Sequence, residues 1–327
     1  MLKRLLKATA RHLPLYRELL QIRDSLHLIH MDLRCIDVRN MRETLNLIVS
    51  DIRRIDAEVS GIHRNICGIR EMGAIRCYDF ELERHPRYGE PHRLHRYALQ
   101  VNSQNGEDGI IREIFRRIGT SNRVFVEIGV GDGKECNTAF LLSQGWSGYW
   151  LDASDAFLRT LETQRESYHG CLTPCVSVVD KENIAALFER LGIPKQYDLL
   201  SLDIDQNTFH VWEALRGFTP RVVVVEYNAA IPPDIDWKVQ YVAERAWDGT
   251  QNFGASLKAF EKLGSQLGYS LVGCDFNGIN AFFVRNDLTS DKFAAPFTAE
   301  NHYEPPRYQF IHRRGHPRTI LDAQRSG

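Results

Sequence analysis

Residues 123–154 read RVFVEIGVGDGKECNTAFLLSQGWSGYWLDAS, and this stretch decides the fold. Val124–Ile128 is an apolar, β-branched run of strand length that ends at a glycine-rich loop. Thr138–Ser143 has the pattern of a short helix, and Gly148–Leu151 that of a second strand, which ends at Asp152. Strand, glycine loop, helix, strand and acid in this order predict a βαβ unit with a ligand-binding loop.

The glycines of this loop, Gly129, Gly131 and Gly133, suit a nucleoside cofactor. Without Cβ atoms the backbone turns tightly and lets a ligand lie against it. Asp152 follows by about 20 residues, a spacing at which a carboxylate accepts hydrogen bonds from both ribose hydroxyls. NAD and S-adenosylmethionine both fit, and a simple tight turn is the structural alternative. The spacing matches neither the G-x-x-x-x-G-K-[ST] phosphate loop nor the G-x-G-x-x-G dinucleotide fingerprint.

An acid ahead of the glycines, Glu127 in E-x-G-x-G-x-G, resembles motif I of class I S-adenosylmethionine-dependent methyltransferases. The resemblance implies that Glu127 buttresses the loop and that Asp152 holds the cofactor ribose. We expect Asp132, within the loop, and Ser154, just after Asp152, to line the same site. The product left in such a site is S-adenosylhomocysteine.

Strand and helix patterns keep alternating after this unit. Asp198–Ile204 and Arg221–Tyr227 are largely apolar, as buried parallel strands are. Ser270–Cys274 and Ala281–Arg285 are joined by a short loop, which predicts an antiparallel ending. The sequence therefore predicts an α/β fold with a doubly wound, Rossmann-like methyltransferase sheet, mostly parallel with an antiparallel C-terminal strand, preceded by a long α-helical coiled coil.

The coiled coil is predicted from two runs of apolar residues at alternating steps of three and four, separated by a register break around Asp37–Thr44. The runs are Leu19, Ile22, Leu26, Ile29, Leu33 and Ile36, then Leu45, Ile48, Ile52, Ile55, Val59, Ile62, Ile66 and Ile69. Isoleucine at both seam positions favours three or four strands, so we expect a homotrimer, with a dimer second. A helix folded back on its own catalytic domain, or a helical hairpin, is the alternative.

These patterns divide the chain into a coiled coil at residues 1–70, a connector at 71–101, a methyltransferase domain at 102–290 and a tail or lid at 291–327. The connector has little periodicity and several Pro, His and Arg residues. Residues 1–13 form a short basic amphipathic pattern. Such a pattern is typical both of a segment that contacts the inner face of a membrane and of an ordinary helix start.

Composition narrows the class of protein. The chain has 327 residues and a net charge of −1, so no overall positive field recruits nucleic acid. No uninterrupted apolar run is long enough to span a bilayer. The seven cysteines lack paired C-x-x-C knuckles, which predicts free thiols in a cytoplasmic protein rather than a zinc site.

Acids stand at the predicted carboxyl ends of the later strands, where ligands bind in an open α/β sheet. Asp180 follows the third strand and is expected to hydrogen-bond the adenine amino group. Asp203 and Asp205 follow the fourth strand, and Glu226 and Asn228 follow the fifth. These are hard oxygen ligands of the kind that Mg²⁺ prefers, so we expect Asp203, Glu226 and Asn228 to hold the metal.

The acids after strands four and five are similar to the metal site of catechol-type and macrocin-type O-methyltransferases. That similarity implies a metal that lowers the pKa of the acceptor hydroxyl, so that its oxygen attacks the methyl group. Here Glu-Tyr-Asn replaces adjacent Asp-Asn, so carboxylates that position sugar hydroxyls, Asp203 and Asp205, are the competing account. His210 is the candidate general base, because imidazole titrates near neutral pH; packing against Trp212 is its structural alternative.

Two segments, SQNGED at residues 103–108 and SLDIDQNTFHVWEALRGFTPRVVVVEYNAAIPP at 201–233, resemble the FkbM-type methyltransferases encoded with bacterial surface-polysaccharide genes. The likeness covers roughly Gln104–Leu288. It implies O-methylation of a sugar hydroxyl of a surface glycan or glycoconjugate, with Gln104 and Glu107 beside the cofactor, although both residues also suit a helix cap. A Rossmann-type nucleotide-sugar or NAD-dependent enzyme, and a coiled-coil scaffold with a silent methyltransferase fold, are the rival hypotheses.

Overall fold

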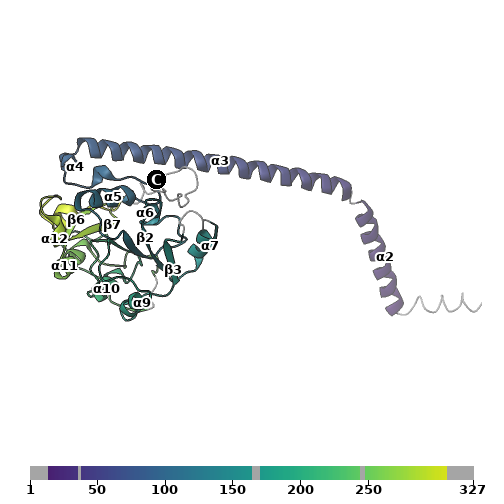
Figure 1. Cartoon of the computed structure of the whole chain (residues 1–327). Coiled ribbons are helices and arrows are strands. Elements are labelled where there is room, and N and C mark those ends of the chain that lie inside the picture. The colour runs from purple at the N-terminus through teal and green to yellow at the C-terminus, as the bar shows by residue number, and fades with distance from the viewer. Residues whose placement is uncertain (1–13, 36–37, 164–169, 244–246, 308–327) are drawn as a thin grey trace, which may run out of the picture. The chain divides into compact units, whose positions relative to one another are not determined.

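The computed structural model describes residues 14–35, 38–163, 170–243 and 247–307 (Figure 1). Contacts divide the chain into two units, Met1–Ile69 and Arg70–Gly327. The segment expected to contact a membrane, residues 1–13, lies outside the described residues. Within the described part of the chain, no helix has both the length and the apolar character needed to cross a bilayer.

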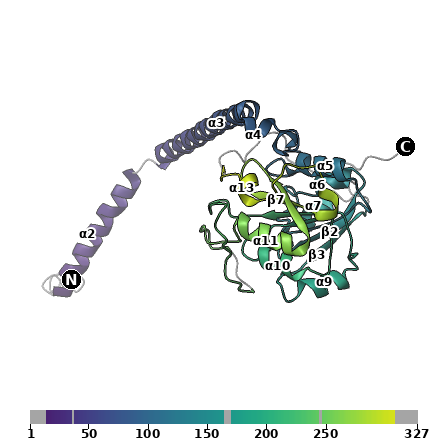
Figure 2. The same ribbon diagram turned by 90° about the vertical axis from the view of Figure 1, so that its left-hand side faces the viewer.

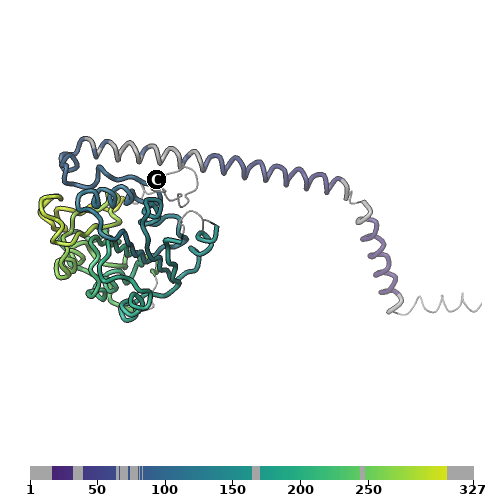
Figure 3. Tube along the Cα trace, viewed as in Figure 1, coloured from purple at the N-terminus to yellow at the C-terminus, as the bar shows by residue number. Residues whose placement is uncertain are grey.

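The N-terminal region is helical. Helix α2 spans Pro14–Cys35 and α3 spans Val38–Arg84 (Figure 3). Proline at the first position of α2 is favourable, because its missing N–H would have no partner there. The described seam side chains are 48% to 60% exposed. They are Leu19, Ile22, Leu26, Ile29, Leu45, Ile48, Ile52, Ile55, Val59, Ile62 and Ile66.

The predicted connector differs from expectation over its first part, because α3 continues to Arg84. Once a helix is nucleated, each added residue gains a hydrogen bond, so weak periodicity alone does not end it. Pro86 ends it, since proline disfavours helical geometry in the residue before it. A short helix, α4 (Pro86–Gly89), and a single 3₁₀ turn, η1 (His95–Tyr97), then precede the α/β part of the second unit.

The second unit contains a seven-stranded sheet in the order β3-β2-β1-β4-β5-β7-β6. All neighbours from β3 to β5 are parallel, whereas β7 is antiparallel to both β5 and β6. The predicted sheet, mostly parallel with an antiparallel C-terminal strand, is therefore confirmed. The strands are β1 (Val124–Ile128), β2 (Ser147–Asp152), β3 (Leu172–Val176), β4 (Leu199–Leu202), β5 (Val222–Glu226), β6 (Tyr269–Cys274) and β7 (Asn280–Arg285).

Helices cover both faces of this sheet, and each face has its own apolar core (Figures 1 and 2). One face packs against α9 (Ile184–Arg190), α10 (Thr208–Ala214) and α11 (Leu257–Leu267). The other packs against α5 (Glu107–Ile118), α6 (Ala139–Ser143) and α7 (Ala156–Thr163). Two further short helices, α12 (Asn286–Thr289) and α13 (Ala299–His302), follow the last strand. Burial on both sides explains why β1, β4 and β5 are apolar nearly throughout.

Part of the segment predicted as a tail or lid is built into the domain. Glu304 is fully buried and contacts Arg87 at 3.1 Å, His95 at 3.0 Å and Arg307 at 2.8 Å. Tyr88 also donates a hydrogen bond to it, at 2.8 Å. Burial alone would raise the pKa of Glu304, but the contacts with His95, Arg87 and Arg307 lower it to about 2. The charged carboxylate thus joins residues 299–307 to residues 87–95.

One glycine fixes how closely the ends of β1 and β4 approach. Gly129 follows β1 with φ +88°, and a Cβ atom on it would lie 1.6 Å from the carbonyl oxygen of Asp203, just after β4. Gly131 has φ +57°, but nothing lies within 4 Å of the Cβ it would carry. A side chain at Gly129 is therefore disfavoured both by the positive φ and by the clash with Asp203. At Gly131 only the positive φ disfavours it.

We expect Gly129→Ala to destabilise the domain far more than Gly131→Ala. Both substitutions place alanine in the left-handed region, at about 1–2 kcal/mol. Only Gly129→Ala also forces the β1 and β4 ends apart, which adds about 1–3 kcal/mol. Denaturant unfolding of the two variants measures the difference; equal losses would show that the close approach to Asp203 is not a constraint.

Candidate functional site

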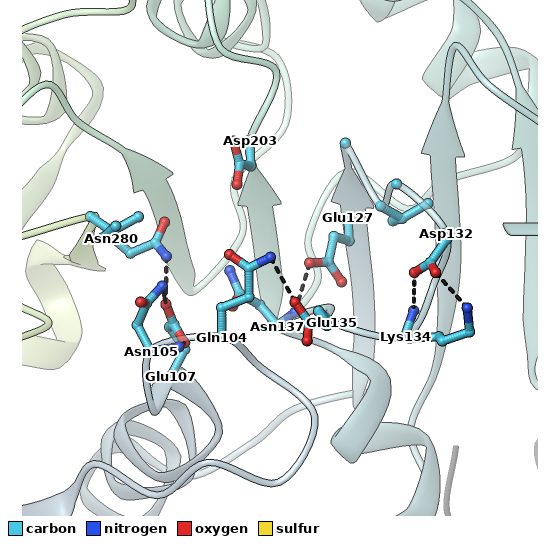
Figure 4. Close-up of a pocket in the computed structure, with 14 residues that line it drawn as sticks. Gln104, Asn105, Glu107, Glu127, Asp132, Lys134, Glu135, Asn137, Asp203 and Asn280 are labelled. Carbon is cyan, nitrogen blue, oxygen red and sulfur yellow. Dashed lines mark hydrogen bonds and ion pairs between the residues drawn. The ribbon is translucent and has the colours of Figure 1, made fainter. Parts of the chain in front are cut away.

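Two cavities open at the carboxyl ends of the parallel strands. The first has a volume of about 520 Å³ and the second of about 700 Å³. Gly129 and Asp203 line both, so the cavities meet where β1 and β4 end. Figure 4 shows the first cavity, which is lined by Gln104, Asn105, Glu107, Glu127, Gly129, Val130, Gly131, Asp132, Lys134, Glu135, Asn137, Asp203, Ile279 and Asn280.

Glu127 joins the end of β1 to the start of α6. Its carboxylate accepts hydrogen bonds from the N–H of Asn137 at 2.8 Å and the N–H of Thr138 at 3.0 Å. The hydroxyl of Thr138 donates a further one. Burial raises the pKa of Glu127 to about 7, against these hydrogen bonds, which lower it. The glycine loop is therefore held at both ends.

Asp152 holds the middle of the loop. One carboxylate oxygen accepts a hydrogen bond from the N–H of Gly131 at 2.8 Å, and the other from the N–H of Ser154 at 2.8 Å. The hydroxyl of Ser154 accepts in turn from the N–H of Ala156, at the start of α7. Asp152 borders the second cavity. The ribose-binding role of Asp152 and the site role of Ser154 stay predictions.

Asp180 lies on the wall of the second cavity, with Asp152. One of its oxygens accepts from the N–H groups of Glu182 and Asn183, at 2.9 and 2.7 Å, and so fixes the turn that precedes α9. Its contact with adenine stays a prediction. Asp132 lies on the first cavity and forms an ion pair of 2.6 Å with Lys134.

Side-chain alternation brings polar groups from four strands to one face of the sheet. Val222 and Val224 pack in the core beside α5, and Val223 and Val225 in the opposite core. Because successive side chains of a strand alternate, Glu226 continues the first set. The same alternation places Glu127 of β1, Ser201 and Asp203 at the end of β4, and Asn280 of β7 on the α5 side.

Three carboxyl groups meet at the ends of β4 and β5. Asp203, Asp205 and Glu226 each have a ligand oxygen within 4.8 Å of the others. Asp203 is exposed to the cavity, but crowding by protein atoms, together with the charges of Asp205 and Glu107, raises its pKa to about 6, while a hydrogen bond with Glu226 opposes the shift. Burial, with the nearby Asp203 charge, raises the pKa of Glu226 well above its usual range. A side-chain hydrogen bond joins Glu226 to Asp203.

The structure corrects the expectation that Asn228 is a metal ligand. Its amide nitrogen donates to the carbonyls of Gln251 and Phe253, at 2.8 and 3.0 Å, and its oxygen accepts from the N–H of Ala230. The side chain is fully buried. Strand β5 ends at Glu226, so the chain has already turned away at Asn228, which instead fixes the 251–253 segment.

His210 is also not placed as a general base. Its Nε2 lies 3.0 Å from the carbonyl oxygen of Val239, and its ring packs against Phe209 and Tyr241. It lines neither of the two cavities. Burial lowers the pKa of the imidazole. His210 is thus a packed histidine, as the structural alternative supposed, but its ring contacts Phe209 and Tyr241 and not Trp212.

Sequence reasoning missed Asn280, which lines the first cavity, and left Glu107 open between a cofactor contact and a helix cap. Glu107 is fully buried and accepts from the N–H of Asn105 at 2.7 Å, the amide of Asn105 at 2.9 Å and the amide of Asn280 at 2.7 Å. The SQNGED run was a signal for Glu107. Asn280 carried none, because its place depends on the pairing of β5 with β7. Gln104 does line the cavity and donates to Glu135 at 3.1 Å.

Comparison with known proteins adds little to this geometry. No protein-family model and no curated protein matches the sequence. Among solved structures the chain is similar to the glycopeptide N-methyltransferase MtfA complexed with S-adenosylmethionine, with 15% identity over 60% of this chain and 98% of that one, at a TM-score of 0.36. An S-adenosylmethionine-dependent methyltransferase from Clostridium acetobutylicum has 14% identity over 57% and 93% of the two chains, at a TM-score of 0.34.

The CurJ carbon methyltransferase has 11% identity over 56% of this chain, at a TM-score of 0.37, and this chain spans about half, 53%, of its length. At such identities and TM-scores the likeness carries no argument about activity. The function therefore follows from features of this structure: the strand order, the glycine loop and the cavities.

The raised pKa of Glu127 predicts a pH-dependent stability. Its native pKa of about 7 exceeds the ordinary 4.5, so the native state holds the extra proton between these values and stability falls as pH rises through this window. The contribution is roughly 3 kcal/mol. Denaturant unfolding measures the free energy of unfolding at pH 5 and at pH 8. Between these values it should fall less in Glu127→Gln than in the wild type, whereas the exposed control Glu162→Gln should show the same fall as the wild type. An unchanged slope in Glu127→Gln would contradict the assignment.

Proposed function

We propose that the chain is an S-adenosylmethionine-dependent O-methyltransferase that methylates a sugar hydroxyl of a bacterial surface glycan or glycoconjugate. The observation that carries the proposal is the junction of the two cavities at Gly129 and Asp203. A cofactor that lies across Gly129 has its nucleoside in the second cavity and its amino-acid end in the first. Its reactive centre then lies beside Asp203.

The second cavity supports the nucleoside part of this proposal. Asp152, the last residue of β2, and Asp180, which follows β3, lie on its wall. In the proposal Asp152 accepts hydrogen bonds from the ribose hydroxyls and Asp180 one from the adenine amino group. Apolar side chains, among them Ile128, Val179 and Trp247, supply a surface for the base.

Charge favours S-adenosylmethionine over NAD. The described carboxylates on the first cavity are Glu107, Glu127, Asp132, Glu135 and Asp203. Lys134 is the cation among its lining residues, and it is paired with Asp132. A sulfonium and an ammonium group suit such surroundings, whereas the pyrophosphate of a dinucleotide would face like charges. This argues against the NAD-dependent rival.

The methyl transfer itself requires little of the protein beyond positioning and proton removal. The acceptor hydroxyl oxygen forms a bond to the methyl carbon as the carbon–sulfur bond breaks, which leaves S-adenosylhomocysteine. The hydroxyl proton passes to a carboxylate, and Asp203 is the carboxylate that borders both cavities. The sugar acceptor is supported by the resemblance of residues 103–108 and 201–233 to FkbM-type enzymes, together with the polar lining of the first cavity.

Two substitutions separate cofactor binding from turnover. Asp152→Ala should weaken S-adenosylhomocysteine binding in calorimetry by about 10- to 100-fold, because it removes hydrogen bonds to a charged group. Asp203→Asn should keep that binding while transfer of labelled methyl groups to a panel of glycan acceptors is lost. Asp155→Ala, an exposed acid that lines neither cavity, is the matched control. Binding of NAD without S-adenosylhomocysteine would overturn the proposal, and cofactor binding without any methyl transfer by the wild type would favour the scaffold hypothesis.

We also propose that the N-terminal helices associate as a homo-oligomer, a trimer in preference to a dimer. The support is the exposed, isoleucine-rich heptad seam on α2 and α3. A cytoplasmic location at the inner face of a membrane, through residues 1–13, stays a prediction.

For the seam we expect Ile55→Asp with Ile62→Asp to convert the oligomer to monomers, because charged groups in a heptad core are left without partners. Light scattering measures the mass. Ser50→Asp with Ala57→Asp, seven residues apart and outside the seam, should leave it unchanged. A monomeric wild type, or a seam variant with wild-type mass, would show that these residues do not associate.

A further inference from the structure

The carboxylate cluster at the ends of β4 and β5 has the composition of a cation site. Asp203, Asp205 and Glu226 place one oxygen each within 4.8 Å of the others. Three carboxyl groups this close cannot all be ionised unless a cation lies among them. Carboxylates alone do not identify a site, so an additional group that points to a ligand is needed.

Asn280 is that group. It lies directly opposite Glu226 in the antiparallel pairing of β5 with β7, so the two side chains share a face of the sheet. Its side chain is 4% exposed and lines the first cavity, and its amide oxygen has no hydrogen-bond partner. A buried amide oxygen without a partner is costly unless a ligand satisfies it.

The orientation of this amide is fixed by Glu107. The Asn280 nitrogen donates to the Glu107 carboxylate at 2.7 Å, and Asn105 donates to the same oxygen at 2.9 Å. A carboxylate accepts hydrogen bonds and does not donate them, so the nitrogen and not the oxygen must face Glu107. Figure 4 shows the Asn280 oxygen turned away from Glu107, on the side of Asp203.

A second buried oxygen without a partner belongs to Glu226. Strand β5 lies between β4 and β7, so Glu226 stands between Asp203 and Asn280. Carboxylate and amide oxygens from three adjacent strands, with Asp205 beside them, thus converge at one edge of the sheet. All four are hard ligands of the type that Mg²⁺ and Mn²⁺ prefer.

We propose that Asp203, Asp205, Glu226 and Asn280 together bind one Mg²⁺-type divalent cation. Asn280 takes the place that the sequence assigned to Asn228, and Glu107 is the positioning residue that orients its amide. Four protein oxygens leave two positions of an octahedral ion for water or for an acceptor hydroxyl. That an acceptor hydroxyl occupies one of these two positions rests on the proposed function. That the cation binds at all does not depend on it. When bound, the cation lowers the pKa of a hydroxyl that it contacts.

Mn²⁺ titration of the full-length protein, followed by electron paramagnetic resonance of the free ion, tests the site without any acceptor. We expect one ion per chain. Asp203→Asn and Glu226→Gln should each weaken binding at least about tenfold. Asn280→Leu should also weaken it, whereas Asn280→Asp combined with Glu107→Gln should tighten it, because a carboxylate then replaces the amide ligand and the second substitution supplies the donor that this carboxylate needs. These opposite shifts distinguish a ligand from a residue that only supports the fold.

The matched control is Glu135→Gln, which removes an exposed carboxylate from the same cavity but outside the cluster. It should leave Mn²⁺ affinity unchanged; an effect as large as that of Glu226→Gln would mean diffuse attraction and overturn the proposal. Absence of Mn²⁺ binding by the wild type, or affinity insensitive to both Asn280 variants, would overturn it too. Circular-dichroism melting confirms that each variant is folded. Cation binding without S-adenosylhomocysteine binding would retain this site and reject the proposed function.

Discussion

The contact between the ends of β1 and β4 is the constraint on which the site depends. The N–H of Asp203 donates to the carbonyl of Ile128 at 2.9 Å, and the Asp203 carbonyl occupies the space that a Gly129 side chain would need. The N–H of Gly129 donates in turn to Leu151 of β2 at 2.9 Å. Three neighbouring strands are thus tied together where they end. Because of this, the glycine loop and the carboxylate cluster share a wall, and both cavities open at the same point.

Buried carboxylates hold the segments around this point. Glu107 joins residue 105 to Asn280, Glu127 joins β1 to α6, and Glu304 joins the segment before α5 to the residues after α13. Each is almost completely buried, and each accepts several hydrogen bonds or ion pairs. A buried carboxylate is tolerable only with such partners, so each acid specifies the position of the chain that supplies them. The loops that line the cavities are positioned in this way.

The local features of the fold could be predicted from the sequence. The apolar runs of β1, β4 and β5 identified buried parallel strands, and the short 275–280 loop identified an antiparallel ending. The predictions were wrong where the position of a residue depends on contacts with residues far away in the sequence. Irregular composition suggested a connector, but α3 runs on to Arg84 until Pro86 stops it. Asn228 and His210 had suitable chemistry and suitable positions along the chain. Both side chains nevertheless bond to backbone carbonyls of residues between 239 and 253, which no local pattern indicated.

The sequence by itself determined to within a few residues where each parallel strand ends, because a strand's own apolar run and its glycine or acid are adjacent along the chain. It thereby determined the glycine loop, the candidate acids Asp152, Asp203 and Glu226, and the heptad seam. Only the tertiary structure decided which of these side chains meet. Asn280 comes beside Glu226 through the register of β5 with β7, and its amide is oriented by Glu107, more than 170 residues earlier in the chain. Side-chain direction at a strand end depends on where pairing stops and which strand lies opposite, and these are properties of the assembled sheet.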